Sequence, residues 1–419
     1  MTSFLERSEG FVALRHRGYR LYFAGMLARG IGVWMQFIAI PWLAVERGAT
    51  PFELGIVSAC LFLPALLISP IGGVVADRVN RLTVLLLAQV GAAIHGGLLL
   101  AFVLTGNVTI EVLALFGLLF GTLTAVELPV RQSFLTDLVP AEEVASAVSL
   151  HAMAWNTTRF LGPAIAGALI ATVGVAACFA VAALSAVPVA GSVVLLRRFR
   201  RHQRSVPTAD RSVLGALRDG VGFASRSPRI RWALVMLSSG GILGIQAFQT
   251  LAPLYVTETL GMGGGAFGAF MGIWGGGALV GTFAVTIFAR GDRRRWLIGG
   301  GASLAALLAA LAVTRWPPVA FGIAAALGFA QVSLIQNAMI TVQQAATDEF
   351  RGRVMGLYTT VFQGTNPLGA MLAGILAGAV GVTGAMLTGA AGLGAMALVA
   401  AAGMSLLPIR VRPDVHPQP

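Results

Sequence analysis

The chain has 419 residues, of which 57% are hydrophobic and 11% are charged, and its formal net charge is +12. Soluble domains average about 25% charged residues, so this composition excludes an ordinary globular protein and indicates a polytopic membrane protein. The positive charge does not indicate a nucleic-acid partner, because it is concentrated in the segments between apolar runs.

Twelve apolar runs follow one another along the chain, each close to the length of about 20 residues that crosses a bilayer. The sequence therefore predicts an all-α protein with twelve transmembrane helices. The expected helices lie near residues 20–45, 52–76, 82–104, 110–130, 145–171, 175–196, 232–256, 264–289, 296–314, 319–344, 354–379 and 384–408.

The longest polar segment divides these runs six and six. We expect an N-terminal six-helix bundle over residues 1–196, a basic cytoplasmic linker over 197–231, and a C-terminal bundle with a short cytoplasmic tail over 232–419. The helical spacing of apolar residues within 212–224 predicts a surface helix in the linker.

Arginine sets the expected orientation. All 29 basic residues are arginine, and 25 of them fall in segments on one side if the helices alternate, against only Arg47 and Arg315 on the other side. By the positive-inside rule both termini are cytoplasmic. Because arginine without lysine is typical of a GC-rich bacterial genome, we expect a multi-pass protein of the bacterial cytoplasmic membrane. We expect it to be a monomer in contact with membrane lipids.

The two halves are related by a shift of 207 residues. Gly162, Gly167 and Gly174 then fall on Gly369, Gly374 and Gly381. Small residues also serve helix packing, but this shared spacing at the fifth helix of each half favours a duplication of six helices.

No catalytic constellation is visible. His95 is the only histidine deep inside an apolar run, and Cys60 and Cys178 lie in apolar runs without ligand spacing. No glycine-rich phosphate loop followed by Lys and Ser or Thr occurs. We therefore expect no enzyme, no metal and no cofactor, and a process driven by a gradient.

Charged and amide side chains inside the helices are the candidates for a substrate cavity. An arginine facing lipid costs at least about 2.5–3.5 kcal/mol, so Arg159 should face water or an acid, whereas Arg29 could also reach the surface. Amide side chains also join helices to one another, and this structural role is the alternative interpretation of each amide candidate. The full candidate set is Arg29, Gln36, Asn156, Arg159, Gln246, Gln249, Asn337, Gln363 and Asn366.

Glu127 is the candidate for proton coupling. It is the one acid inside a helix of the first half away from the outer surface, and it precedes Arg131 by four residues. A local i, i+4 salt bridge is the alternative reading. No acid is expected at the depth of Arg29 and Arg159, so the cavity should be positive and favour anionic or phenolate substrates over dications.

The loop between the second and third runs has the pattern G-x3-D-R-x2-R, formed by Gly73, Asp77, Arg78 and Arg81. A turn held inside by arginine is the simple interpretation. The pattern also resembles the loop between helices 2 and 3 of the major facilitator superfamily (MFS). That resemblance implies a latch between the two bundles, in which Asp77 contacts Arg131 or the start of the eleventh helix.

Further segments resemble one branch of the superfamily. They begin at Glu127, Asp348 and Arg159, and the last continues into Gly162, Pro163 and Gly167, which resemble the helix-5 motif of antiporters. The chain is similar to drug:proton antiporter 3 exporters, also called transmembrane secretion effectors, whose substrates include macrolides, tetracyclines and siderophores. The resemblance implies export of small amphipathic molecules by proton antiport. Proton-coupled uptake and a receptor or scaffold without transport remain the alternatives.

Overall fold

Helices form almost all of the described chain. The computed structural model describes residues 9–78, 80–196, 213–288 and 293–405, and these contain no strand. The first half contains η1 (Glu9–Arg15), α2 (Arg17–Glu46), α3 (Pro51–Arg78), α4 (Arg81–Leu104), α5 (Ile110–Asp137), η2 (Ala141–Glu143), α6 (Val144–Thr172) and α7 (Val175–Leu196).

The second half begins with a short helix outside the bundle, α8 (Val213–Arg226). The seventh membrane helix is assembled from four pieces, of which η4 and η5 are π-helical. These are α9 (Pro228–Ser239), η4 (Gly240–Ile245), α10 (Gln246–Leu254) and η5 (Tyr255–Thr259). The remaining helices are α11 (Gly264–Phe288), α12 (Arg293–Val313), α13 (Pro317–Ala345) and α14 (Asp348–Ser405).

The expectation of twelve membrane helices is confirmed. Among the described residues, 10 helices are long and apolar enough to cross a membrane, with α14 counted once. The α14 helix is two helices that meet at Gly381, where φ is 76°. The twelfth is α6, whose sequence is more polar because it carries Asn156 and Arg159.

One helix is longer than expected. The sequence predicted an end near residue 130, but α5 continues to Asp137 and contains Pro129. Proline removes only one backbone hydrogen bond, which neighbouring helices in a membrane bundle tolerate. Glu127 and Arg131 therefore lie on successive turns of one continuous helix.

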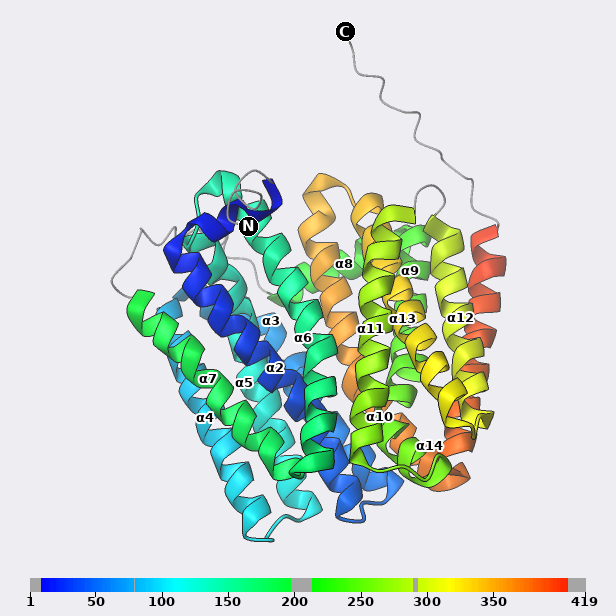
Figure 1. Ribbon diagram of the computed structural model, residues 1–419. Coiled ribbons are helices and arrows are strands. Elements are labelled where there is room, and N and C mark those ends of the chain that lie inside the picture. Colours follow the sequence, from blue (N-terminus) through cyan, green and yellow to red (C-terminus); the bar gives the residue numbers. More distant parts are fainter. Residues whose placement is uncertain (1–8, 79, 197–212, 289–292, 406–419) are drawn as a thin grey trace.

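The two ends of the molecule differ in their connections. Figure 1 shows the start of α2 and the end of α14 at the same end, which we call the terminal end. The opposite end, here the hairpin end, has tight turns. All five described glycines with positive φ close turns there: Gly48, Gly106, Gly174, Gly261 and Gly381. A side chain at such a φ is strained, which explains glycine at these positions.

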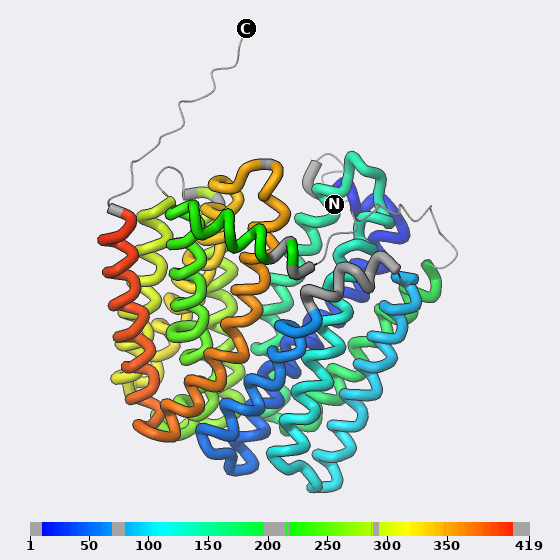
Figure 2. The backbone as a smooth tube through the Cα atoms, turned by 180° about the vertical axis from the view of Figure 1, so that it is seen from behind, coloured from blue at the N-terminus to red at the C-terminus, as the bar shows by residue number. Residues whose placement is uncertain are grey.

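The bundles contact each other from the hairpin end to about mid-depth. Helix α6 packs against α11, and helix α3 packs against α14 (Figures 1 and 2). A Cβ on Gly167 would lie 2.5 Å from the Cα atom of Gly268, and one on Gly374 would lie 2.7 Å from that of Gly55. One glycine of each contact is related to the other by the 207-residue shift, because Gly167 falls on Gly374.

The apolar core is divided in the same way. One buried cluster joins the hairpin-end half of the first bundle to the second bundle, through residues such as Trp42 and Phe267, whose rings stack 5.2 Å apart. A separate cluster fills the terminal end of the first bundle, around Tyr19, Tyr22 and Phe134. The structure is therefore a state in which the bundles are joined at the hairpin end.

The helix expected in the linker packs on the second bundle. In Figure 2, α8 runs across the terminal end, and it contacts the start of α14. The rings of Phe223 and Phe350 stack 4.8 Å apart, and Asp219 pairs with Arg353 at 3.5 Å. These contacts fix α8 to the C-terminal half.

Candidate functional site

A cavity of about 420 Å³ lies between the two bundles. Its walls come from α2, α3, α5 and α6 on one side and from η4, α10, α11, α13 and α14 on the other. Aromatic and amide side chains dominate the lining. They are Trp34, Phe37, Phe62, Trp155, Phe267, Trp274 and Phe362, with Gln246, Gln249, Gln331, Gln363 and Asn366.

Arg159 lies between two indole rings in this cavity. Its guanidinium carbon is 5.3 Å from the ring centroid of Trp34 and 4.6 Å from that of Trp274. Because Trp34 belongs to the first bundle and Trp274 to the second, this pair of cation–π contacts crosses the bundle interface. The Nε atom of Arg159 is buried without a hydrogen-bond partner, and no ion pair of Arg159 is seen among the described residues. Among the described residues, the guanidinium of Arg159 thus contacts two aromatic faces and pairs with no acid.

Glu127 lies between two buried arginines of the first bundle. Its Oε1 accepts from Arg131 at 3.3 Å, and its Oε2 is 3.9 Å from an Nη atom of Arg29. All three residues are at most 4% exposed. Arg131 also lies 4.6 Å over the ring of Trp155. Glu127 and Arg131 line the cavity, whereas Arg29 lies behind them.

The expectation that no acid lies at the depth of Arg29 is wrong. That depth was counted along single helices, and the packing of α2 against α5 brings Glu127 to Arg29. The charges at the cavity are therefore two arginines around one glutamate, plus Arg159. Their sum is still positive, because three cations face one anion.

Two hydrogen bonds between side chains link helices of the second bundle beside the cavity. Gln246 donates to Asn366 at 3.0 Å, and Trp274 donates to Gln331 at 3.2 Å. The Oε1 atom of Gln246 and the hydroxyl of Thr250 are buried without a partner in the described structure. Both residues line the cavity.

The comparisons with known proteins decide the family. The family model described as transmembrane secretion effector matches residues 8–418. The chain belongs to this family of MFS transporters. The resemblance seen in the sequence is thereby confirmed, and the family and fold are those of transporters, not of enzymes.

Similar proteins include transporters of known and unknown substrate. The multidrug efflux pump Tap of Mycobacterium tuberculosis is 28% identical over 85% of this chain and 86% of its own. The staphyloferrin A transporter of Staphylococcus aureus is 31% identical, over 40% of this chain and 45% of its own. An uncharacterized MFS-type transporter of Bacillus subtilis, YfiS, is 24% identical over 88% of each chain.

Solved structures share the fold. The nucleoside transporter NupG superposes with a TM-score of 0.70 at 12% identity, covering 93% of this chain and 100% of that one. The D-xylose-proton symporter gives 0.72 at 15% identity, covering 93% and 97%. A bacterial homolog of the lysosomal transporter Spinster, described as inward-facing and unoccupied, gives 0.67 at 14% identity, covering 95% and 96%.

In this family member, the structure brings together five of the nine cavity candidates. Arg159, Gln246, Gln249, Gln363 and Asn366 line the cavity. The lining does not include Arg29, Gln36, Asn156 or Asn337. Arg29 turns to Glu127, and Asn337 donates to the Ser333 carbonyl and accepts from Arg293, so both take part in contacts between or within helices.

The sequence reasoning missed the aromatic half of the site. Trp34, Trp155 and Trp274 were not singled out, because a tryptophan in an apolar run also suits packing or lipid contact. A signal existed in the polar candidates: Trp155 lies next to Asn156, on the same helix as Arg159. Gln331 was also missed, because its partner Trp274 is on another helix.

The latch motif is only partly described. Gly73, Asp77 and Arg78 end α3, and their contacts lie outside the described residues. Arg81 pairs with Asp137 at 2.9 Å, which joins the start of α4 to the end of α5 within one bundle. Arg131 is engaged with Glu127 in this state, so the expected contact between Asp77 and Arg131 stays a prediction.

The helix-5 motif lies on close helix contacts. A Cβ on Gly162 would lie 2.5 Å from the Cβ of Trp34, Pro163 lines the cavity, and Gly167 meets Gly268 of the other bundle. These small residues let α6 approach α2 and α11. No group of three or more His, Cys, Asp or Glu in the described part of the chain could hold a metal ion.

Proposed function

We propose that the protein exports small amphipathic molecules by alternating access, with the cavity around Arg159 as the substrate site and Glu127 as the proton site. The observation that carries this proposal is an aromatic-lined cavity between the two bundles, in which Arg159 lies between two indole rings and has no acidic partner among the described residues. The aromatic walls suit the apolar part of a substrate, and Arg159 suits an anionic or phenolate group. The names of the relatives, a multidrug efflux pump and a staphyloferrin A transporter, support this substrate class.

Orientation gives the direction of access. If the arginine-rich terminal end is cytoplasmic, the described state is closed to the outside and receives substrate from the cytoplasm. Rocking of the bundles would then open the hairpin end and release the substrate outside. The latch of Gly73, Asp77, Arg78 and Arg81 would close the terminal end in that second state.

Protonation of Glu127 would couple to substrate through charge. An ionised Glu127 makes the cavity less positive, so it disfavours an anion and leaves a neutral amphiphile less affected. A neutral substrate can exchange with a proton only by competing with it in the cavity that Glu127 lines, because charge does not link its binding to protonation. A strongly anionic substrate would bind best together with the proton, and this linkage favours the second candidate function, proton-coupled uptake. The NupG and xylose-symporter folds are compatible with either direction.

Flux in reconstituted vesicles tests the proposal. Purified protein is placed in liposomes that contain a fluorescent amphiphile, either neutral or carrying one carboxylate, and a pH gradient of either sign is imposed. We expect the neutral amphiphile to move against the proton flow. Movement of both compounds with the proton flow would instead establish uptake, and flux that no pH gradient changes would exclude proton coupling.

Replacement of Glu127 by glutamine should abolish the pH dependence of flux. The change removes the one acid paired with Arg29 and Arg131, and breaking such a buried pair costs about 3–5 kcal/mol, so a lower melting temperature is also expected. Glu127→Asp keeps the charge and serves as the control. Binding of a neutral amphiphile to the purified variant reports whether it is folded. If folded Glu127→Gln protein retains pH-driven flux, the proton site lies elsewhere.

A further inference from the structure

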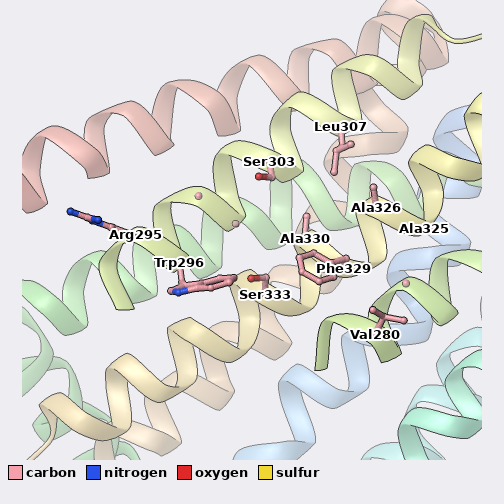
Figure 3. A pocket seen from close by; sticks show the side chains of 13 residues that line it. Val280, Arg295, Trp296, Ser303, Leu307, Ala325, Ala326, Phe329, Ala330 and Ser333 are labelled. Atoms are coloured by element: carbon pink, nitrogen blue, oxygen red, sulfur yellow. The ribbon is translucent and has the colours of Figure 1, made fainter. Parts of the chain in front are cut away.

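A second cavity lies wholly within the C-terminal half. It has a volume of about 740 Å³ between α11, α12 and α13, and it shares no lining residue with the central cavity. Its walls are mostly apolar and include the small residues Gly277, Gly299 and Gly300. Ala325 and Ala326 also line it (Figure 3). Val280 on its rim is 61% exposed, so the cavity is a groove that opens on the outside of the bundle, where a membrane protein meets lipid.

One end of the groove is polar and cationic. Arg295 and Trp296 stand at this end in Figure 3, and Leu307 stands at the other. Both polar residues lie in the first turns of α12, where the helix macrodipole is positive. Arg293 donates to Asn337 at 3.3 Å and Arg294 donates to the Ala401 carbonyl at 3.4 Å, and Arg295 lines the groove while also making a contact of its own.

The length of the groove matches one leaflet. Arg295 and Leu307 are 12 positions apart on α12, which at about 1.5 Å per residue is about 18 Å. Half of a hydrocarbon core of about 30 Å is about 15 Å. Tryptophan and arginine are also the residues found at headgroup level. The groove thus runs from the headgroup region at the terminal end to about the middle of the bilayer.

We propose that this groove binds an anionic phospholipid, with the phosphate at Arg295 and the start of α12 and with one acyl chain along the glycine and alanine wall. The cation at the mouth and the positive end of α12 select negative charge. The apolar floor and its one-leaflet length select an acyl chain over a short amphiphile. The site is independent of the transport cycle proposed above.

A side chain that fills the groove tests the acyl-chain site. A Cβ on Gly299 would have nothing within 4 Å, so Gly299→Leu fits the fold and projects into the groove. Gly322→Leu, on α13, is a matched control because its Cβ also meets nothing within 4 Å and Gly322 does not line the groove. Native mass spectrometry of detergent-purified protein titrated with phosphatidylglycerol measures the bound lipid. Lost contact with two methylene groups weakens binding about tenfold, so we expect at least this loss for Gly299→Leu and none for Gly322→Leu. Equal binding by both variants would refute the site.

The headgroup is tested with phosphatidylcholine of the same chain length. Wild-type protein should prefer phosphatidylglycerol, and Arg295→Gln should remove the preference, whereas Arg20→Gln, an exposed arginine of α2 at the same end, should not. Two outcomes overturn the proposal. Equal binding of both lipids by wild-type protein would mean ordinary annular lipid. If a transported amphiphile displaces the lipid from wild-type protein but not from Gly299→Leu protein, the groove is a substrate entry site.

Discussion

Replacing Gly167 by valine should abolish transport, with a residual rate below about one tenth of wild type. The Cβ atom would lie 2.5 Å from the Cα of Gly268 and 2.9 Å from its carbonyl carbon, across the bundle interface. Both atoms are backbone, so the clash cannot be relieved by a rotamer change. Overpacking costs about 1–3 kcal/mol, and here the cost falls only on the state joined at the hairpin end. The ratio of the population of that state to that of the alternative state would fall by up to about 100-fold.

Gly191→Val is the control for this change. Gly191 is also in the first bundle, and a Cβ there has nothing within 4 Å. The control should transport at the wild-type rate. If Gly167→Val protein inserts normally and still transports at more than half the wild-type rate, the contact between α6 and α11 does not need to re-form in each cycle.

Replacing Arg159 by glutamine should weaken the binding of anionic substrates much more than the binding of neutral substrates. A hydrogen bond to a charged group contributes about 1.5–3 kcal/mol, so affinity for a carboxylate-bearing amphiphile should fall about 10- to 100-fold. A neutral amphiphile held by Trp34 and Trp274 should lose less than about threefold. Binding to purified protein, followed by tryptophan fluorescence or calorimetry, measures both affinities.

Arg159→Lys distinguishes charge from stacking. Lysine keeps the charge but lacks the planar guanidinium that lies over both indoles. It should retain most of the affinity for the anion if charge dominates. An equal loss of all substrates in Arg159→Gln and Arg159→Lys would show that Arg159 only joins the two bundles, and the anion preference would then be dropped.

The sequence was sufficient for the helices because each bilayer-spanning run is a local property of the chain. The duplication was equally visible, and it has a structural counterpart: Gly174 and Gly381, related by the shift, both close hairpin-end turns with positive φ, of 95° and 76°. The end of α5 was placed too early, because the apolar run ends near residue 130 whereas the helix continues through more polar residues to Asp137.

The site was harder to predict because its contacts join distant segments. Glu127 and Arg29 are far apart along the chain, and only the packing of α2 against α5 places them 3.9 Å from each other. The stacking of Trp274 on Arg159 depends in addition on how the two bundles meet. No pattern within one helix encodes such a contact. Polarity within α6 did indicate which helix would carry the central cation.

Distance measurement between paired spin labels tests alternating access to the Arg159 cavity most directly. One pair spans the bundles at the hairpin end, on the exposed positions Arg47 and Glu258, and a second spans them at the terminal end, on Arg20 and Arg226. Without a gradient, we expect a short hairpin-end distance, as in the described state. With substrate and a pH gradient, the hairpin-end distance should lengthen while the terminal-end distance shortens. If both distances stay fixed during measured transport, or change in the same direction, the bundles do not rock about the cavity and alternating access at this site is wrong.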